Sequence, residues 1–442
     1  MDICETPSFS RDLITVLSRH FPEHFARRRG SLGPRAVFLT LMTMSVLGCR
    51  SYCRALRELR QVMGDELGWL LREPSKCAFS QARRKLSSQD CVAAFTTIRQ
   101  RLGKARMIPR ETFHGLRLHS IDGTRLSLPV SSALSKTFGH PENQYPEPAA
   151  CPQAGLVVLW DTSANQPVSW ELGSYKLGER EAGMRLFGHL GPGDLLLADR
   201  GFPGFDVFHT LFARGADFVI RMNTTSVAKS LEFQAFLAGQ AHDLVVEFAP
   251  FHQRDRRFPG SDPMRIRFVR DPQRPDCVLA TSLIDAARIT ACDILAVYRL
   301  RWNIETAFRE SKQWHGLEDF HATFPDGIHQ EVAAIMTFIY LTGELEVEMR
   351  VKVRERIAQG KEPPASAEQL PYRFNRLLLA DVTKDLIFLA ITNPDGITKE
   401  WEASLWALWR ERDRITPGRS FSRRAKSPRA VSRKAPGVRR PR

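Results

Sequence analysis

The sequence predicts an α/β domain that follows an all-helical region and is followed by further helices. Residues 111–350 contain short apolar runs typical of strands, with segments of helical spacing between and after them. Residues 8–104, in contrast, show apolar residues at helical spacing only. We therefore expect a helical N-terminal domain at 1–110, an α/β domain at 111–350 and a helical C-terminal region at 351–416.

The charge of the chain is concentrated at its two ends. The formal net charge is +15, of which residues 1–110 hold +11 and residues 417–442 hold +10, which leaves about −6 for residues 111–416. Basic ends around an acidic centre suit an enzyme that binds a polyanion and places metal ions among its acids. Arginine-rich ends that only aid solubility are the alternative.

The N-terminal region is predicted to form five helices. One of them, "SKCAFSQARRKL" at 75–86, is a candidate recognition helix, because glutamine and arginine can contact base edges and phosphates. An ordinary basic surface helix has the same pattern, so both interpretations stay open. Helical spacing predicts that one face is buried and the other is exposed: Phe79, Ala82 and Leu86 inside, and Gln81, Arg83, Arg84 and Lys85 outside.

The run "RAVFLTLMTMSVLGC" resembles a lipoprotein signal, because it ends in Leu-Gly-Cys at Cys49. Its apolar part begins only near Ala36 and is about 12 residues long, too deep for an ordinary signal peptide and too short to span a bilayer. We therefore expect a buried helix and no membrane contact, with an exported lipoprotein as the alternative. The eight cysteines form no repeated CxxC pair, so we do not expect a zinc site. We expect the cysteines to be reduced, as in a cytoplasmic protein.

The α/β region begins with a strand and a Gly turn at 115–129. The elements expected after it are strands at 154–161 and 166–173, a helix at 179–190, a buried strand within 193–204, a helix at 205–215 and a strand at 216–223. A β-rich insertion is expected at 224–284, and then one helix from about 286 to 314 and another at 330–352. The basic tail at 417–442 is expected to be disordered.

Three carboxylates stand out by position. Asp122 is expected to end its strand before Gly123, and Asp199 follows the apolar run "LLLA". Strand ends at the carboxyl edge of a sheet are where α/β folds place their chemistry. Glu305, from a helix packed across the sheet, would complete a pocket for two Mg²⁺ or Mn²⁺ ions. Each aspartate taken singly is also an ordinary turn residue.

The stretch "YRLRWNIETAFRESKQ" at 298–313 places four polar residues on one helical stripe. Tyr298, Arg301, Glu305 and Lys312 are three, four and seven residues apart, and each interval returns close to the same face. A solvated stripe with an i,i+4 Arg–Glu pair is the plain interpretation.

These segments together resemble the DDE transposases of the insertion-sequence-four family. "LHSIDGTRLSLP", "LLLADRGFPG" and "YRLRWNIETAFRESK" match its three acidic segments, and the Tyr-x2-Arg-x3-Glu-x6-Lys signature is complete. The resemblance covers about 75–380 and implies a ribonuclease-H-like mixed sheet flanked by helices, with a β insertion between the second aspartate and the glutamate.

The resemblance also implies roles for particular residues. Asp122, Asp199 and Glu305 would bind the metal ions, while the neighbouring basic and phenolic groups would hold DNA. The implied DNA-binding residues are Tyr298, Arg301, Lys312, Arg200 and Arg221, to which the recognition-helix pattern adds Arg83 and Arg84. The implied partners are double-stranded DNA, as transposon ends with inverted repeats and as target, and a second copy of the chain in the DNA complex. We expect a nucleoid-associated protein.

One position departs from the family. Some members carry a tryptophan four residues before the Thr-Ser that corresponds to Thr281–Ser282 and stack a flipped base on it. Here that position is Cys277, and no tryptophan lies within 224–284. The resemblance implies cleavage through a DNA hairpin, and here that step is either absent or supported by another aromatic residue. A catalytically inactive DNA-binding relative that represses its own element, and a stand-alone structure-specific nuclease, are the competing functions.

The basic tail generates a first prediction. Deletion of residues 417–442 should weaken DNA binding on all sequences alike and reduce the slope of log K against log salt, because fewer counterions are released. Binding titrations at several salt concentrations measure this slope, and an unchanged slope would contradict the expectation.

Overall fold

The computed structural model describes residues 32–47, 51–63, 74–105, 112–142, 150–223, 230–249, 262–360, 372–392 and 397–414. The predicted helix "RDLITVLSRHF", Cys4, Cys49 and the predicted disordered tail at 417–442 lie outside these ranges.

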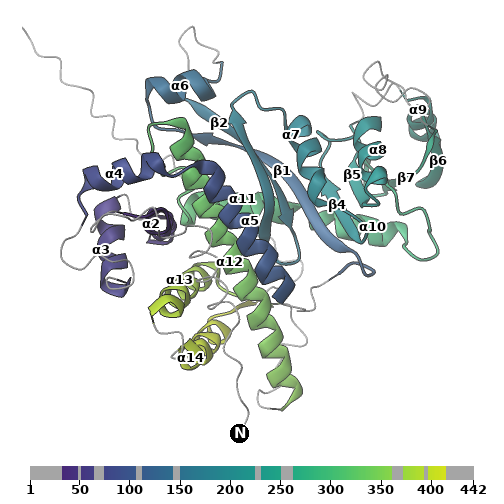
Figure 1. Ribbon diagram of the computed structural model, residues 1–442. Helices are drawn as coiled ribbons and strands as arrows, with labels where there is room; N and C mark the ends of the chain where they lie inside the picture. Colours follow the sequence, from purple (N-terminus) through teal and green to yellow (C-terminus); the bar gives the residue numbers. More distant parts are fainter. Residues whose placement is uncertain are drawn as a thin grey trace, which may run out of the picture.

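The centre of the molecule is a mixed sheet whose described strands run in the order β3-β2-β1-β4-β5-β8-β7-β6 (Figure 1). β1 pairs in parallel with β4, and β4 with β5, whereas β2 runs antiparallel to both β1 and β3. The order β3-β2-β1-β4-β5, with β2 alone reversed, is a ribonuclease-H-like sheet, which confirms the expected fold class. These strands are β1 (Arg117–Ser127), β2 (Gln153–Asp161), β3 (Gln166–Ser174), β4 (Asp194–Ala198) and β5 (Asp217–Arg221).

The segment after β5 extends the same sheet. β8 (Arg274–Thr281) pairs antiparallel with β5, β7 (Met264–Asp271) with β8, and β6 (Asp243–Phe248) with β7. The predicted strand-like pieces of the insertion are therefore present. The segment also contains a helix that the sequence analysis missed, α9 (Leu231–Ala238), whose Ser230 caps the first turn by accepting from Phe233 N.

Helices cover both faces of the sheet. One face packs against α7 (Glu179–Leu186), the 3-10 turn η2 (Phe187–His189), α8 (Phe205–Ala213) and α9. The other face packs against α6 (Ser132–Phe138), α10 (Ala291–Arg299), α11 (Trp302–Trp314) and α12 (Pro325–Ala358). Side chains alternate between the faces of a strand, so residues two apart in β1 or β4 meet the same helices.

The long helix α12 lies between the sheet and the other helices (Figure 1). It contacts β3 on one side and helices of both terminal regions on the other, and it continues across position 350. The helices of the two terminal regions are α2 (Pro34–Leu47), α3 (Tyr52–Met63), α4 (Lys76–Lys85), α5 (Ser88–Ala105), α13 (Arg376–Thr392) and α14 (Ile397–Arg410). Two short strands, β9 (Tyr372–Arg373) and β10 (Asp413–Arg414), pair beside the C-terminal helices.

The apolar run near Ala36 forms α2, and the prediction of a buried helix is confirmed. Val37 and Phe38 are fully buried in a core shared with α12. Among the helices in the described ranges, none combines the length and apolar composition that crossing a bilayer requires.

Two predictions of element boundaries are wrong. β1 does not end at Asp122 but continues to Ser127, because residues 119–127 stay paired with β2 after the parallel pairing with β4 stops at Ser120. The helix expected from 286 to 314 is two helices. Around Leu300 and Arg301 the backbone forms i→i+3 hydrogen bonds, which tighten the chain into a 3-10 turn between α10 and α11.

The C-terminal end of α11 generates a prediction on pH. His315 is 9% exposed beside Phe338. Burial, together with the charge of Arg376, lowers its pKa to about 4. Its unfolded pKa is about 6.5, so between these values the unfolded chain binds a proton that the folded chain does not. Stability should therefore fall as pH drops from 6.5 to 4. In His315→Gln this fall should be smaller, as measured by melting temperature against pH. Parallel curves for the two proteins would contradict it.

Candidate active site

Asp122 and Asp199 lie on the same face of two neighbouring parallel strands. Leu118 of β1 and Leu197 of β4 pack in the cluster that contains α10. Asp122 is four residues after Leu118 and Asp199 two residues after Leu197, so alternation turns both toward the α10–α11 face. Asp122 thus stands two residues beyond the end of the parallel pairing, although its strand continues. Of the two strands, only β4 ends at the carboxyl edge predicted from the sequence, whereas β1 continues beyond that edge.

The two aspartates are held by local backbone hydrogen bonds. Gly123 N donates to Asp122 Oδ1 at 2.9 Å, and Gly201 N donates to Asp199 Oδ1 at 2.8 Å. Burial raises the pKa of Asp122 to about 6, and the negative charges of Asp199 and Glu179 add to this rise. Arg301 acts in the opposite direction and lowers this pKa.

Arg301 joins Asp122 to Glu305. Its Nη1 lies 3.6 Å from Asp122 Oδ2, and its Nη2 lies 2.7 Å from Glu305 Oε1. The Arg301 side chain is 8% exposed, while that of Glu305 is 33% exposed. The structure therefore brings Asp122, Arg301 and Glu305 together, and Asp199 acts electrostatically on Asp122 from the adjacent strand. As they stand, no three His, Cys, Asp or Glu side chains of the described residues lie close enough together to hold a metal ion.

Tyr298 lies on α10, before the break, and still belongs to this site. Burial raises its pKa to about 12, and the charged or polar groups that act on its hydroxyl are Arg301, Cys277, Asp199 and Arg221. The predicted stripe is therefore distributed over two helices, but it converges on one pocket.

Lys312, at the other end of the stripe, is already engaged. Its Nζ donates to the carbonyl of Arg125 at 2.7 Å and lies 3.2 Å from Glu318 Oε1. It thus fixes the last turn of α11 to the strand that carries Asp122. Its side chain is still 27% exposed, so one side of the ammonium group faces solvent.

The other predicted DNA-binding residues differ in exposure. Arg200 is exposed directly after Asp199. Arg221 ends β5 and pairs with the exposed Asp276 at 3.3 Å. Arg84 is exposed on α4, where its guanidinium lies 5.1 Å from the ring of Phe324.

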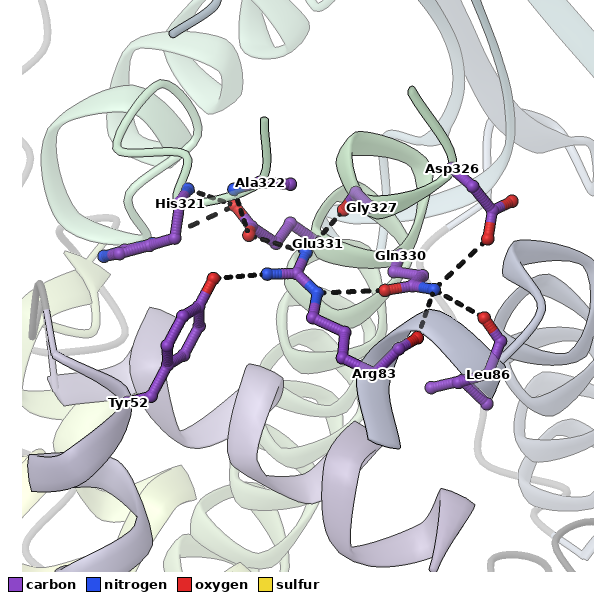
Figure 2. A network of polar contacts seen from close by, with 9 residues as sticks. All are labelled: Tyr52, Arg83, Leu86, His321, Ala322, Asp326, Gly327, Gln330 and Glu331. Carbon is purple, nitrogen blue, oxygen red and sulfur yellow. Dashed lines mark hydrogen bonds and ion pairs between the residues drawn. The ribbon is translucent and has the colours of Figure 1, made fainter. Parts of the chain in front are cut away.

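Arg83 is not exposed, and the prediction that it faces outward is wrong. Its side chain is 2% exposed and pairs with Glu331 of α12 at 2.7 Å (Figure 2). Helical spacing places it on the exposed half of an isolated α4, but α12 covers that side. The predicted burial of Phe79 and Leu86 and the exposure of Gln81, Arg84 and Lys85 agree with the structure, while Ala82 is half-buried.

Glu179 is a carboxylate at this site that the sequence analysis missed. It is the first residue of α7 and is half-buried, and a Cβ at Gly123 would lie 2.6 Å from its Oε1. Burial raises its pKa, with Asp199 as the next cause. Acids are common in the first turn of any helix because of the helix dipole, so its position in the sequence carries no distinguishing signal.

Trp302 is an exposed aromatic beside the pocket. Its side chain is 58% exposed, and the Arg301 guanidinium lies 5.2 Å from its ring. Cys277, at the position where some relatives have tryptophan, is 5% exposed within β8.

The carboxylate pocket generates a prediction on stability. At pH 7.5, without divalent ions, Asp122→Asn should stabilise the fold by about 1–2 kcal/mol. The folded pKa of Asp122 lies above its unfolded value, so its ionisation weakens folding as pH rises through about 6. Urea unfolding measures the change. The exposed Asp276→Asn is the matched control and should change stability by less than about 0.5 kcal/mol. A destabilised Asp122→Asn variant would contradict the reasoning.

Comparisons with known proteins identify the family. A family model described as "Transposase DDE domain" matches residues 114–341, just over half of the chain and a span that includes all three carboxylates. A relative, "Transposase InsG for insertion sequence element IS4" of Escherichia coli (strain K12), is 25% identical over 238 residues, which are 53% of this chain and 52% of that protein. The chain thus matches about half the length of this relative.

A solved structure is also similar. The cryo-EM structure of a piggyBac transposase synaptic complex with hairpin DNA covers 92% of this chain, and this chain covers 87% of it, at 11% identity and a TM-score of 0.42. A score this low carries no conclusion about this chain. The family match, which spans residues 114–341, carries the assignment: this chain belongs to the transposase DDE domain family, as its three acidic segments predicted.

Proposed function

We propose that this protein is a DNA transposase that cuts and joins DNA at the pocket formed by Asp122, Asp199 and Glu305. One observation carries the proposal. Carboxylates from β1, from the end of β4 and from α11 converge on a single face of a ribonuclease-H-like sheet, inside the segment that matches the family. Asp122 and Glu305 are joined by Arg301, and Asp199 acts on Asp122 from the end of the neighbouring strand.

DDE transposases use divalent metal ions, and this pocket fits that requirement chemically. Oxygen ligands suit Mg²⁺ or Mn²⁺. Two ions would supply activation of the attacking hydroxyl or water and neutralisation of the leaving oxygen. Burial, the main cause of the raised pKa of Asp122, and the neighbouring charges of Asp199 and Glu179 disfavour its ionised form, which a bound cation would stabilise. We propose Asp122, Asp199 and Glu305 as the metal ligands. To bind a metal ion, Glu305 would give up its contact with Arg301.

Arg301 has a second role in this proposal. As found, its guanidinium is the positive charge between Asp122 and Glu305. Once Glu305 turns away, the Nη2 group that donates to it becomes available to a phosphate of the DNA, and arginine can grip phosphate in a forked geometry. We propose that the Tyr298 hydroxyl donates a hydrogen bond to the same phosphate, because burial raises its pKa to about 12 and keeps it protonated, and because Arg301 acts on it electrostatically.

DNA would reach the pocket over the exposed cations around it. Arg200 follows Asp199, Arg221 ends the next strand, and Lys312 presents part of its ammonium group to solvent. We propose that these residues hold the backbone of transposon ends and target DNA, that Arg84 contacts DNA on α4, and that two chains pair two ends in a dimer. Association with the nucleoid in the cytoplasm is part of the same proposal.

If cleavage passes through a hairpin, Trp302 is our candidate for the aromatic that stacks an unpaired base. Cys277 cannot stack, whereas Trp302 combines 58% exposure with a position next to Arg301. Its neighbour Leu300 is 41% exposed, so this rim of the pocket is apolar and open.

Cleavage of a labelled transposon-end duplex in Mg²⁺ tests the proposed function. Glu305→Gln should bind the duplex as the wild type does but cut at least about 100-fold more slowly, because it loses the charge that holds a metal ion. Glu181→Gln, which removes the charge of an exposed carboxylate on α7 that pairs with the exposed Arg185, is the matched control for loss of one charge.

The remaining outcomes separate the alternatives. Equal cutting by wild type and Glu305→Gln would remove Glu305 from the site. Binding without cutting by the wild type would favour a repressor, and cutting that ignores the end sequence and joins nothing would favour a structure-specific nuclease.

A further inference from the structure

A buried polar network joins the N-terminal helices to the start of α12 (Figure 2). Its centre is Arg83, which the sequence pattern had assigned to DNA. The guanidinium donates through Nε to Gln330 Oε1 at 3.0 Å, through Nη1 to the Tyr52 hydroxyl, and through Nη2 to the Gly327 carbonyl at 2.7 Å. Nη2 also lies 2.7 Å from Glu331 Oε1. Every nitrogen of this side chain is therefore used inside the protein.

Gln330 and Asp326 fix the junction between α4 and α5 to the same helix. Gln330 Nε2 donates to the carbonyls of Arg83 and Leu86 at the end of α4. Asp326 accepts from the backbone and hydroxyl of Ser88, the first residue of α5. These contacts leave α4 little freedom to rotate or slide on α12.

Glu331 carries the network onward to the segment between α11 and α12. Its two oxygens accept from the backbone N–H groups of His321 and Ala322 at 2.9 and 3.1 Å. One carboxylate therefore joins Arg83 to the segment that leaves the active-site helix.

The same segment is tied to the candidate active site. Glu318 accepts from the backbone of Ser127 on β1 and pairs with Lys312 of α11. At the end of α11, the His315 carbonyl accepts from Ser45 of α2 at 3.0 Å. These two sets of polar contacts are joined by the chain between Glu318 and Ala322, and together they connect α4 with the helix and strand that carry Glu305 and Asp122.

The exposed residues of α4 are held in a fixed position relative to this network. Arg83 and Arg84 both lie over the ring of Phe324, at 5.6 and 5.1 Å, immediately before α12. Arg84 and Lys85 remain exposed, so DNA bound by them would be held at a fixed offset from the pocket.

We propose that Arg83 is a positioning residue, whose buried pair with Glu331 sets the register between DNA bound on α4 and the carboxylates of the candidate active site. This proposal rests on the proposed transposase function. A buried ion pair is a poor source of net stability compared with apolar side chains of the same volume, but its geometry is specific. The planar fork of arginine fixes direction as well as distance, which a point charge on lysine does not.

The test uses the double variant Arg83→Met/Glu331→Gln in the full-length protein. The pair removes both charges together, so no unpaired charge stays buried, and the melting temperature reports whether the fold is kept. We expect the dissociation constant for the transposon-end duplex to stay within about twofold. Single-turnover cleavage at saturating DNA should fall by roughly 10- to 100-fold, and mapped cut sites should spread over neighbouring positions, because a displacement of about 1 Å is enough to misplace the scissile phosphate.

Two further variants separate positioning from direct DNA contact. Arg84→Met, the exposed neighbour, should weaken binding while the cut stays at one position. Arg83→Lys keeps the charge without the fork and should recover only part of the cleavage rate. If Arg83→Met/Glu331→Gln weakens binding as Arg84→Met does and cuts at the wild-type position, the proposal is wrong.

Amide hydrogen exchange provides a measurement that does not depend on cleavage. The double variant should exchange faster than the wild type in peptides covering Trp302–Trp314, with the strands of the sheet unchanged. Unchanged exchange in that helix would overturn the positioning role even if the enzyme cuts DNA. If the wild type never cuts, the proposed function fails, and exchange still decides whether Arg83 is coupled to α11.

Discussion

Every buried charge on α12 must find a partner, and this constraint determines how the rest of the chain is arranged. An unpaired charge in the interior costs several kcal/mol, so each acid on a buried helix specifies what packs beside it. Glu331 requires Arg83 from the N-terminal helices, Glu344 accepts from Gln166 of β3, and Glu346 pairs with Arg376 of α13. One helix thus receives a partner from each part of the chain that surrounds it.

The candidate active site shows the opposite balance of charge. Asp122, Asp199 and Glu179 act on one another as like charges, and Arg301 is the cation that contacts Asp122 and Glu305. A pocket arranged for folding alone would have matched these charges. Local destabilisation of this kind is expected where a site must gain a ligand, because the free energy of binding then offsets the repulsion.

The paired acids of α12 and the carboxylates of the candidate active site are connected through the segment between α11 and α12. Glu331 of α12 is paired with Arg83 and also holds this segment, and the segment in turn adjoins the end of the helix that carries Glu305. A strained site needs such support, because side chains that repel one another would otherwise move apart. The helical N-terminal region therefore contributes to the geometry of the pocket as well as to the basic surface of the protein.

The sequence by itself determined the parts that depend on local pattern. Asp199 could be placed because a short, continuous apolar run is typical of a buried central strand, and Glu305 because four polar residues kept helical spacing and matched a family signature. The alternation of strands and helices predicted an α/β domain, and the resemblance to the transposase family implied that its sheet is mixed. The tertiary structure decided the rest. Periodicity reports which face of an isolated helix is apolar, but Arg83 is buried by residues about 247 positions away along the chain. The continuation of β1 past Asp122 and the approach of Glu179 to Gly123 likewise follow from contacts between separate elements, which no local spacing records.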